Sequence, residues 1–382
     1  MTEATKGITF GGGQFHLDAV PRVIAASDWE RLEAGLLQRV RALDAWCADV
    51  YGERRIVREG VVPERVIDTI DTLEPAVCGT RLDRWVAIAG LDVVRAPDGR
   101  FLVLEDNLRT PSGMAYAVAA RVTTLMLLEP AEPPVPVDGL RDMLRLALGE
   151  GRAVLLTDGP SNDAYWEHAW LAELLDIPLV EPSEVDLTGV DVVYRRTNAW
   201  QLDSAVGRLL QAAGVRVVNA YGVGVGDDKL AHAYVEDMVR YYLGEEPLLG
   251  SVRTYDLGRR EVLEEALDRI EELVIKPRAG YGGEGVVICP HASREDVAGI
   301  REDVRAAPED YIAQELIPLS EHLTVIDGAF VPRHVDLRPF VFLGPGDSGR
   351  VLPGGLTRVA LDEGALVVNS SQNGGAKDTW VV

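Results

Sequence analysis

Val-Ile-Lys-Pro-Arg-Ala-Gly-Tyr-Gly-Gly-Glu-Gly, residues 274–285, is an apolar segment that ends in Lys276 and runs into four glycines. Glycines between two strands can form a flexible hairpin whose backbone N–H groups close on phosphate oxygens. Lys276, at the end of the first strand, would add a point charge. The stretch predicts a lid over a nucleotide, and a plain glycine turn beside a surface lysine is the alternative.

Lysine is rare in this chain: only four of the 38 Lys and Arg residues are lysine. Three of them, Lys229, Lys276 and Lys377, stand near glycines or aspartates. The lysine ammonium is a compact charge on a flexible side chain, and it fits sites where a planar guanidinium does not. These lysines therefore suggest bound phosphate, although the role of Lys377 is left open.

Composition limits the classes of function. The 382 residues carry a net charge of -23, which disfavours binding to nucleic acid and to anionic membranes. No stretch approaches the ~18 apolar residues of a membrane span, the start lacks a secretory signal, and the three cysteines have no ligand or redox spacing. We expect a cytoplasmic protein. No His-Glu-x-x-His, P-loop or Rossmann glycine motif occurs.

The chain divides at a proline-rich stretch, residues 129–138, which can neither continue a helix nor form a regular ladder. Before it, a capping box at Ser27 and Glu30 begins a predicted helix over 28–50, and a hairpin with acidic ends is predicted over 83–107. After it, strands at 153–157, 191–194 and 215–219 alternate with helices at 162–175 and 201–213. This alternation favours a small parallel sheet.

Four units follow from this reading. A helix from Asp228 and a second helix at 261–271 precede the glycine segment, and residues 311–368 are rich in strand patterns. The predicted units are 1–128, N-terminal helices and the hairpin; 139–222, the small parallel sheet; 223–318, which contains the glycine lid; and 319–382, the C-terminal strands.

The motifs form an ordered series. After Lys229 and Lys276 come Gln-Glu at 314–315, Asp336-Leu-Arg338 on one face of a strand, Arg358, and Asn369 followed by Gly374-Gly375; Gly90-Leu-Asp92 and Glu105-Asp-Asn107 lie near the start. This order resembles that of ATP-grasp enzymes, with the metal strands moved to the other end. The chain is therefore similar to the circularly permuted ATP-grasp family, the glutathionylspermidine synthetase-like carboxylate–amine ligases. The implied fold is α/β, a permuted ATP-grasp core with a small Rossmann-like domain. The resemblance implies that 1–128, with a metal-binding hairpin, and 319–382 form the core, that 223–318 is an ATP-binding lid, and that 139–222 is the Rossmann-like domain.

The resemblance implies a role for each matching residue. For ATP these are Lys229, Lys276, Gly280, Tyr281, Gly282, Gly283, Gln314, Glu315, Leu316 and Ile317, with Glu321 or His322 near the ribose. Catalysis would use Arg338, Arg358, Ser112 and Asn369, and Mg²⁺ (or Mn²⁺) would be held by Asp92, Glu105 and Asn107. The alternatives are an acidic sheet edge, structural ion pairs and ordinary turns. Arg195, Arg196 and Thr197 end a strand and could hold an anionic acceptor or serve packing.

The implied reaction joins two small molecules or peptides. ATP phosphorylates a carboxylate, an amine attacks the acyl phosphate, and an amide, ADP and phosphate result. Two alternatives stay open, namely a phosphotransferase that stops at the phosphorylated product and a nucleotide-binding protein without catalysis. The sequence names neither substrate and gives no oligomeric state.

Overall fold

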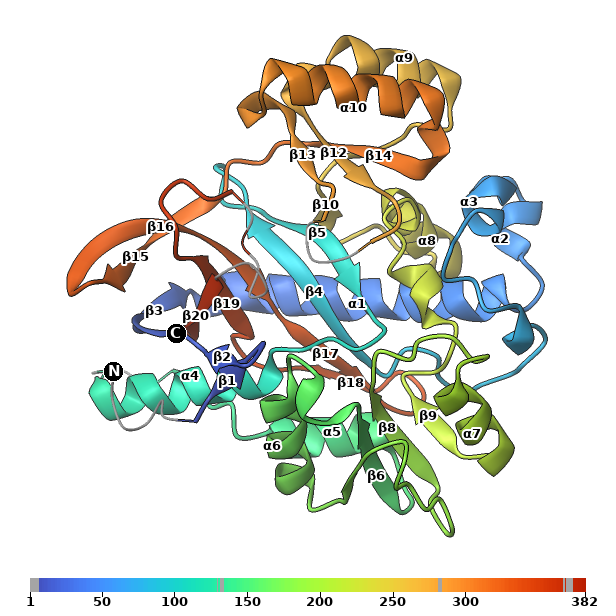
Figure 1. Ribbon diagram of the computed structural model, residues 1–382, viewed down its shortest axis with the longest axis vertical. Coiled ribbons are helices and arrows are strands. Elements are labelled where there is room, and N and C mark those ends of the chain that lie inside the picture. The colour runs from blue at the N-terminus through green and yellow to red at the C-terminus, as the bar shows by residue number, and fades with distance from the viewer. Residues whose placement is uncertain (1–6, 129, 131–133, 281–283, 367, 369–373) are drawn as a thin grey trace.

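The structure is a computed structural model that describes residues 7–128, 130, 134–280, 284–366, 368 and 374–382. A ten-stranded sheet runs through its centre, in the order β10-β5-β4-β16-β19-β20-β3, with β15 paired to β16, β17 to β4, and β18 to β17 (Figure 1). The bounds are β3 Leu17–Ile24, β4 Ile88–Arg95, β5 Phe101–Asn107, β10 Gly250–Ser251, β15 Ser320–Ile326, β16 Ala329–Arg338, β17 Phe340–Leu343, β18 Gly349–Val351, β19 Leu356–Ala360 and β20 Gly374–Val381.

The central sheet joins the two ends of the chain. Its strands β4 and β5 form the predicted hairpin, and β4 pairs with β16 and β17 from the C-terminal part. β20 lies parallel to β3, and the Val382 N–H donates to the Ile24 carbonyl at 3.1 Å. The permuted order of motifs therefore produces one continuous sheet, which confirms the predicted fold class.

One face of the sheet is covered by the long helix α1 (Ala26–Val50). Leu32, Leu36, Val40 and Leu43 recur at helical spacing and are at most 2% exposed in the core cluster that includes β4. Burial of each contributes roughly 2 kcal/mol. The predicted capping box is wrong. Helix α1 begins at Ala26 after an extended Ala25 with no side-chain cap, so Ser27 lies inside the first turn.

The other face of the sheet is covered by helices from the middle of the chain. These are α4 (Met114–Leu127) and α5 (Leu140–Leu148), which share a second core cluster with strands β17 and β19. Two short helices, α2 (Arg55–Arg58) and α3 (Glu64–Asp68), and the ribbon β1 (Thr9–Phe10) and β2 (Gly13–Gln14) lie outside this layer. Among the described residues, no helix combines the length and apolarity required to cross a membrane.

The predicted small parallel sheet is confirmed, in the order β7-β6-β8-β9. The structure adds β7, which the sequence did not predict. Elements and bounds are β6 Ala153–Thr157, α6 Tyr165–Leu175, β7 Leu179–Val180, β8 Val192–Arg196, α7 Ala205–Ala213 and β9 Arg216–Val218. All the pairings are parallel, so the carboxyl ends of the strands meet at one edge. Asn219, just after β9, ties that edge to the central sheet by accepting the Ala87 and Ile88 N–H groups at 2.8 and 2.9 Å.

A third sheet, β11-β14-β12-β13, forms the lid at the top of Figure 1. Its elements are β11 Thr254–Asp256, α9 Arg260–Asp268, β12 Leu273–Pro277, β13 Val287–Ile288, α10 Arg294–Ala306 and β14 Tyr311–Glu315. The strand before the glycine segment is thus confirmed. The helix predicted from Asp228 is confirmed in part: the chain is helical from Ala231 to Leu243, but only α8 (Val235–Met238) is α-helical, between a 3-10 segment and a π segment. α10 was not predicted.

Candidate active site

A cavity lies between strand β5 of the central sheet and strands β12 and β14 of the lid. Its volume is about 10 Å³, and it is lined by Leu104, Glu105, Asp106, Asp227, Lys229, His232, Lys276, Ile312 and Gln314. Four of these residues carry predicted roles: Glu105, Lys229, Lys276 and Gln314. The structure therefore brings together, in one place, residues that are up to about two hundred positions apart in the chain.

Both predicted phosphate lysines face this cavity. Lys229 Nζ lies 3.8 Å from Glu105 Oε1 and donates to the Gly280 carbonyl at 2.8 Å, so the base of the glycine segment lies against it. Lys276 is half-buried, and burial lowers the pKa of its ammonium; Glu105 opposes this effect and Lys229 adds to it. Two ammonium groups that share one carboxylate leave an excess of positive charge, which suits an anionic ligand.

Beside the cavity, Asp92 on β4 is held by two arginines. Arg338 Nε and Nη2 donate to its two oxygens at 2.7 and 3.0 Å, and Arg358 Nη2 lies 2.9 Å from Oδ2. Arg358 also donates to Asp336, its partner across the β16–β19 ladder, at 2.8 Å from Nε. Burial alone would raise the pKa of Asp92, but the two guanidinium groups outweigh it and lower that pKa.

Ser112 connects this cluster to the small sheet. Its carbonyl accepts from Arg338 Nη1 at 3.3 Å, and its hydroxyl accepts from Arg196 Nη2 at 2.6 Å. Arg196 also pairs with Glu167 at 3.0 Å, and Glu167 accepts the Gly113 N–H at 2.9 Å where α4 begins. Gly113 has a φ of 128°, a conformation that side chains other than glycine rarely adopt. Thus Ser112, predicted for catalysis, lies in a fixed turn between two arginines.

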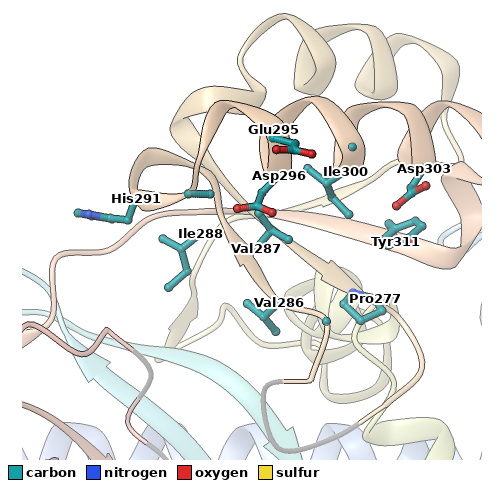
Figure 2. A pocket seen from close by; sticks show the side chains of 13 residues that line it. Pro277, Val286, Val287, Ile288, His291, Glu295, Asp296, Ile300, Asp303 and Tyr311 are labelled. Carbon is teal, nitrogen blue, oxygen red and sulfur yellow. The ribbon is translucent and has the colours of Figure 1, made fainter. Parts of the chain in front are cut away.

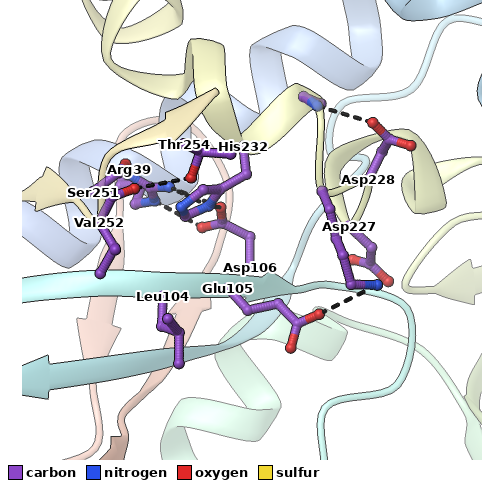
Figure 3. Close-up of polar contacts among 12 residues, drawn as sticks. Arg39, Leu104, Glu105, Asp106, Asp227, Asp228, His232, Ser251, Val252 and Thr254 are labelled. Atoms are coloured by element: carbon purple, nitrogen blue, oxygen red, sulfur yellow. Dashed lines mark hydrogen bonds and ion pairs between the residues drawn. The ribbon is translucent and has the colours of Figure 1, made fainter. Parts of the chain in front are cut away.

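The predicted metal ligands share one face of the β4–β5 hairpin. Asp92 pairs directly with Glu105, and Asn107 lies two residues further along β5, opposite Gly90. A Cβ at Gly90 would lie 2.8 Å from Pro111 Cβ, so only glycine permits this close approach. Asp106, between the two, points to the other face and pairs with Arg39 at 2.7 Å and with His232 at 2.7 Å (Figure 3).

The donors in this hairpin fit a magnesium ion only in part. Glu105 is about one-third exposed, and the Asn107 amide nitrogen is buried without a partner, so both can reorient toward an ion. Both oxygens of Asp92, in contrast, accept from arginine. Among the described residues no group of three His, Cys, Asp or Glu side chains is placed to hold a metal. The role of Asp92 as a direct ligand remains a prediction.

In the predicted adenine segment, the side chains of Gln314 and Glu315 point in opposite directions. Gln314 lines the cavity, and its Nε2 donates to Thr254 Oγ1 at 3.0 Å and to the Leu104 carbonyl at 3.4 Å. Glu315 points the other way and accepts from the Tyr255 hydroxyl at 2.5 Å. Leu316 and Ile317 follow the strand and are half-buried.

The remaining predicted residues lie elsewhere or outside the described residues. Glu321 on β15 lies 3.8 Å from His334, and His322 Nδ1 lies 3.1 Å from the Leu323 carbonyl; neither lines the cavity. Tyr281, Gly282, Gly283 and Asn369 fall outside the described residues. Lys377 is fully buried and pairs with Asp18, and its ammonium donates to the Leu323 carbonyl at 2.9 Å, so it serves the fold.

Sequence reasoning missed the layer beneath the cavity. His232 is 4% exposed and lines the cavity above the Arg39–Asp106 pair, and Arg278 pairs with buried Asp228 at 2.8 Å. The partners in each pair are far apart in the chain. The only local signal in the sequence was the pair Asp227-Asp228 before Lys229, which could have suggested a turn held by side-chain hydrogen bonds.

A second groove lies on the lid, between α10 and the β12–β13 hairpin (Figure 2). Three carboxylates, those of Glu295, Asp296 and Asp303, line it, and its lining residues, among those that the structure describes, include no lysine or arginine. Two of the three carboxylates at the first cavity, those of Asp106 and Asp227, are instead paired with Arg39 and Arg109. Negative charge there disfavours phosphate. The cavity at Lys229 and Lys276 is therefore the better candidate for an anionic nucleotide.

The chain was compared with known proteins. A family model described as circularly permuted ATP-grasp type 2 matches residues 21–360. A putative glutamate–cysteine ligase of Frankia casuarinae is 43% identical over 96% of this chain but only 47% of its own length, so the chain spans about half of that relative. An uncharacterized protein of Mycobacterium tuberculosis is 42% identical over 99% of this chain and 76% of its own length.

The fold was also compared with solved structures. A glutathione synthetase-like effector from Globodera pallida, in its apo form, superposes with a TM-score of 0.60, at 12% identity, over 96% of this chain and 90% of that one. At this identity the likeness concerns the fold alone. The family match extends through both halves of the permuted core, including the β4–β5 hairpin and the β16–β19 ladder. The chain therefore belongs to the circularly permuted ATP-grasp family.

Proposed function

We propose that this protein is an ATP-dependent carboxylate–amine ligase that works through an acyl phosphate. The observation that carries the proposal is the direct pairing of Asp92 with Glu105 across the β4–β5 hairpin. It places the Arg338–Asp92–Arg358 cluster next to the cavity that contains Lys229 and Lys276. A site for nucleotide phosphates thus adjoins a site with concentrated guanidinium groups.

In this proposal the nucleotide lies between lid and sheet. Lys229 and Lys276 neutralise its phosphates, while the backbone after Gln314 meets the base edge. A magnesium ion would be held by Glu105 and Asn107 and would neutralise charge on the phosphates. The cavity volume of about 10 Å³ is far below the roughly 300–1,000 Å³ of ordinary ligand pockets, so we infer that the lid opens to admit ATP.

The chemistry follows from charge placement. A substrate carboxylate oxygen attacks the terminal phosphorus, the bond to the bridging oxygen breaks, and ADP leaves. The amine then attacks the acyl carbon and loses a proton, and phosphate leaves with one oxygen from the carboxylate. Arg338 and Arg358 stabilise the charge on the transferring group. Neither step requires a covalent bond to the protein.

The substrates are proposed only as classes, a small-molecule or peptide carboxylate and an amine. The Frankia name describes a protein about twice as long, so its glutamate and cysteine are not assigned to this chain. A phosphotransferase, which would stop after the first step, and a nucleotide-binding protein without catalysis are the other candidates. Neither is favoured by a particular contact among the described residues.

The test uses carboxylates labelled with ¹⁸O. A panel of acids is incubated with the protein, magnesium, ATP and a panel of amines, and phosphate and amide are analysed by mass spectrometry. A ligase yields amide and phosphate that carries one ¹⁸O. A phosphotransferase yields a stable phosphorylated acid, and a binding protein yields neither. Arg338→Ala should slow amide formation by about 10²–10³-fold while nucleotide affinity stays within about threefold.

A further inference from the structure

The carboxyl edge of the small sheet contains a guanidinium without an acidic partner. Arg195, at the end of β8, is 1% exposed; its Nη1 donates to the Ala199 carbonyl at 3.3 Å, and its guanidinium lies 4.7 Å from the centre of the Tyr221 ring. Among the described residues, no carboxylate forms an ion pair with it. Its neighbours differ: Arg196 pairs with Glu167 and Arg109 with Asp227.

Two further unpaired polar atoms belong to Thr197, two residues further along the chain, and to Tyr221, whose ring this guanidinium contacts. Arg195 Nε, Thr197 Oγ1 and Tyr221 Oη are all buried without a hydrogen-bond partner. Buried polar groups in native proteins are nearly always paired, and leaving one unpaired is costly. A guanidinium N–H and two hydroxyls can all donate, so one acceptor with several lone pairs would satisfy the group. A carboxylate is such an acceptor.

The position of this edge links it to the proposed active site. Arg196, the residue after Arg195, donates to the Pro111 carbonyl at 2.7 Å and to the Ser112 hydroxyl, and the carbonyl of Ser112 accepts from Arg338. Open parallel sheets commonly bind ligands beyond the carboxyl ends of their strands. A molecule whose reacting group lies at Arg338 can thus extend toward Arg195.

We propose that Arg195, Thr197 and Tyr221 form a subsite for a carboxylate that the reaction does not consume. One substrate is then an amino acid or a dicarboxylic acid. This inference rests on the proposed function, because it assigns the second acid group of the same substrate. Burial lowers the pKa of Arg195 to about 10; Tyr221 and Asp227 oppose this effect, whereas Arg109 and Arg196 add to it, and a bound anion would oppose it further.

Matched acids test the subsite. Calorimetric titrations compare succinate, glutarate, adipate, L-aspartate and L-glutamate with butyrate and 4-aminobutyrate, each with and without a non-hydrolysable ATP analogue and magnesium. We expect at least one diacid or acidic amino acid to bind about tenfold more tightly than the monoacids, because a hydrogen bond to a charged group is worth about this much. Equal affinity for all of these acids would overturn the subsite.

Two isosteric variants separate binding from folding. Tyr221→Phe and Thr197→Val each remove an unpaired hydroxyl, so melting temperature should stay the same or rise, whereas affinity for the preferred acid should fall about tenfold. In the matched control, Tyr242→Phe removes a hydroxyl bonded to Asp49 at 2.9 Å; it should lower the melting temperature and leave acid affinity unchanged. Unchanged acid affinity in both test variants would overturn the proposal.

The same titrations distinguish this inference from the proposed function. Absence of nucleotide binding in the wild type would count against the ligase, whatever the acids do. Normal nucleotide binding without a preference for the second carboxylate would overturn the subsite alone. Because the acids are also titrated without nucleotide, the subsite is judged in either case.

Discussion

At the scale of single residues, the site depends on the sharing of charges. The Asp92 carboxylate pairs with the guanidinium groups of Arg338 and Arg358. Glu105 lies 3.8 Å from the Lys229 ammonium, and its charge acts to raise the pKa of Lys276. The motif order predicted that Arg338, Arg358, Lys229 and Lys276 belong to one site; the structure brings both lysines to the cavity and both arginines to Asp92 beside it. The motif order could not predict that Asp92 turns to the arginines, because the choice between a metal and a guanidinium depends on distances set by the β4–β16 contact.

Replacing Asp92 by asparagine should destabilise the protein. The change keeps the shape but leaves Arg338 and Arg358 with less negative charge, and breaking such a buried pair costs about 3–5 kcal/mol. Urea denaturation followed by circular dichroism measures the loss. Asp98→Asn is the control, because Asp98 and its partner Arg100 are both well exposed, and its midpoint should not move. Equal midpoints for the two variants would contradict the structural role of Asp92.

Nucleotide affinity should depend on pH through Lys276. The protonated ammonium binds phosphate and the neutral amine does not, so affinity falls as pH rises through its pKa. Because burial lowers that pKa from 10.5, the fall should begin at a lower pH than for an ordinary lysine. Fluorescence titrations from neutral pH to 10.5 measure it. The Lys276→Arg variant should bind nucleotide more weakly, but its affinity should not show this pH dependence. Constant nucleotide affinity of the wild type over the same pH range would contradict the prediction.

At the scale of elements, local sequence patterns predicted most strands and helices. They failed where contacts with distant parts of the chain determine the local structure. α1 and the β4–β5 hairpin follow their apolar periodicity. In α10, only Val297, Ile300 and Val304 are buried and most positions are charged, so the pattern is weak. The helical segment predicted from Asp228 begins only at Ala231, because the Asp228 carboxylate accepts the Leu230 and Ala231 N–H groups and pairs with Arg278.

The cap of α10 should control the local stability of the lid. Ser293 Oγ accepts the Asp296 N–H at 3.1 Å, and Ser293→Ala should cost about 1 kcal/mol. Hydrogen exchange should show this loss in α10 and leave α7 unaffected. Ser204→Ala, which removes the cap of α7, should give the reverse pattern. If both variants loosened both helices equally, the lid would not be an independent unit of stability.

At the scale of the whole molecule, the permuted chain builds the site from distant segments. Asp92 and Arg338 are separated by 246 positions, and the Lys377–Asp18 pair by 359. The order of motifs predicted that the two ends of the chain share one sheet, because the resemblance to the permuted ATP-grasp fold places the strands that carry these motifs side by side. The buried pairs Arg39–Asp106 and Arg121–Asp378 were not predictable, since nothing near either partner specifies the other.

The most direct measurement is calorimetric binding of a non-hydrolysable ATP analogue with magnesium to three proteins. The wild type should bind, and Lys276→Ala should bind about tenfold or more weakly, because a charge-assisted contact to phosphate is lost. Arg260→Ala, which removes one exposed positive charge from the lid, should bind like the wild type. No binding by the wild type at millimolar concentration, or equal affinity of Lys276→Ala and the wild type, would contradict a nucleotide site between the lid and the central sheet.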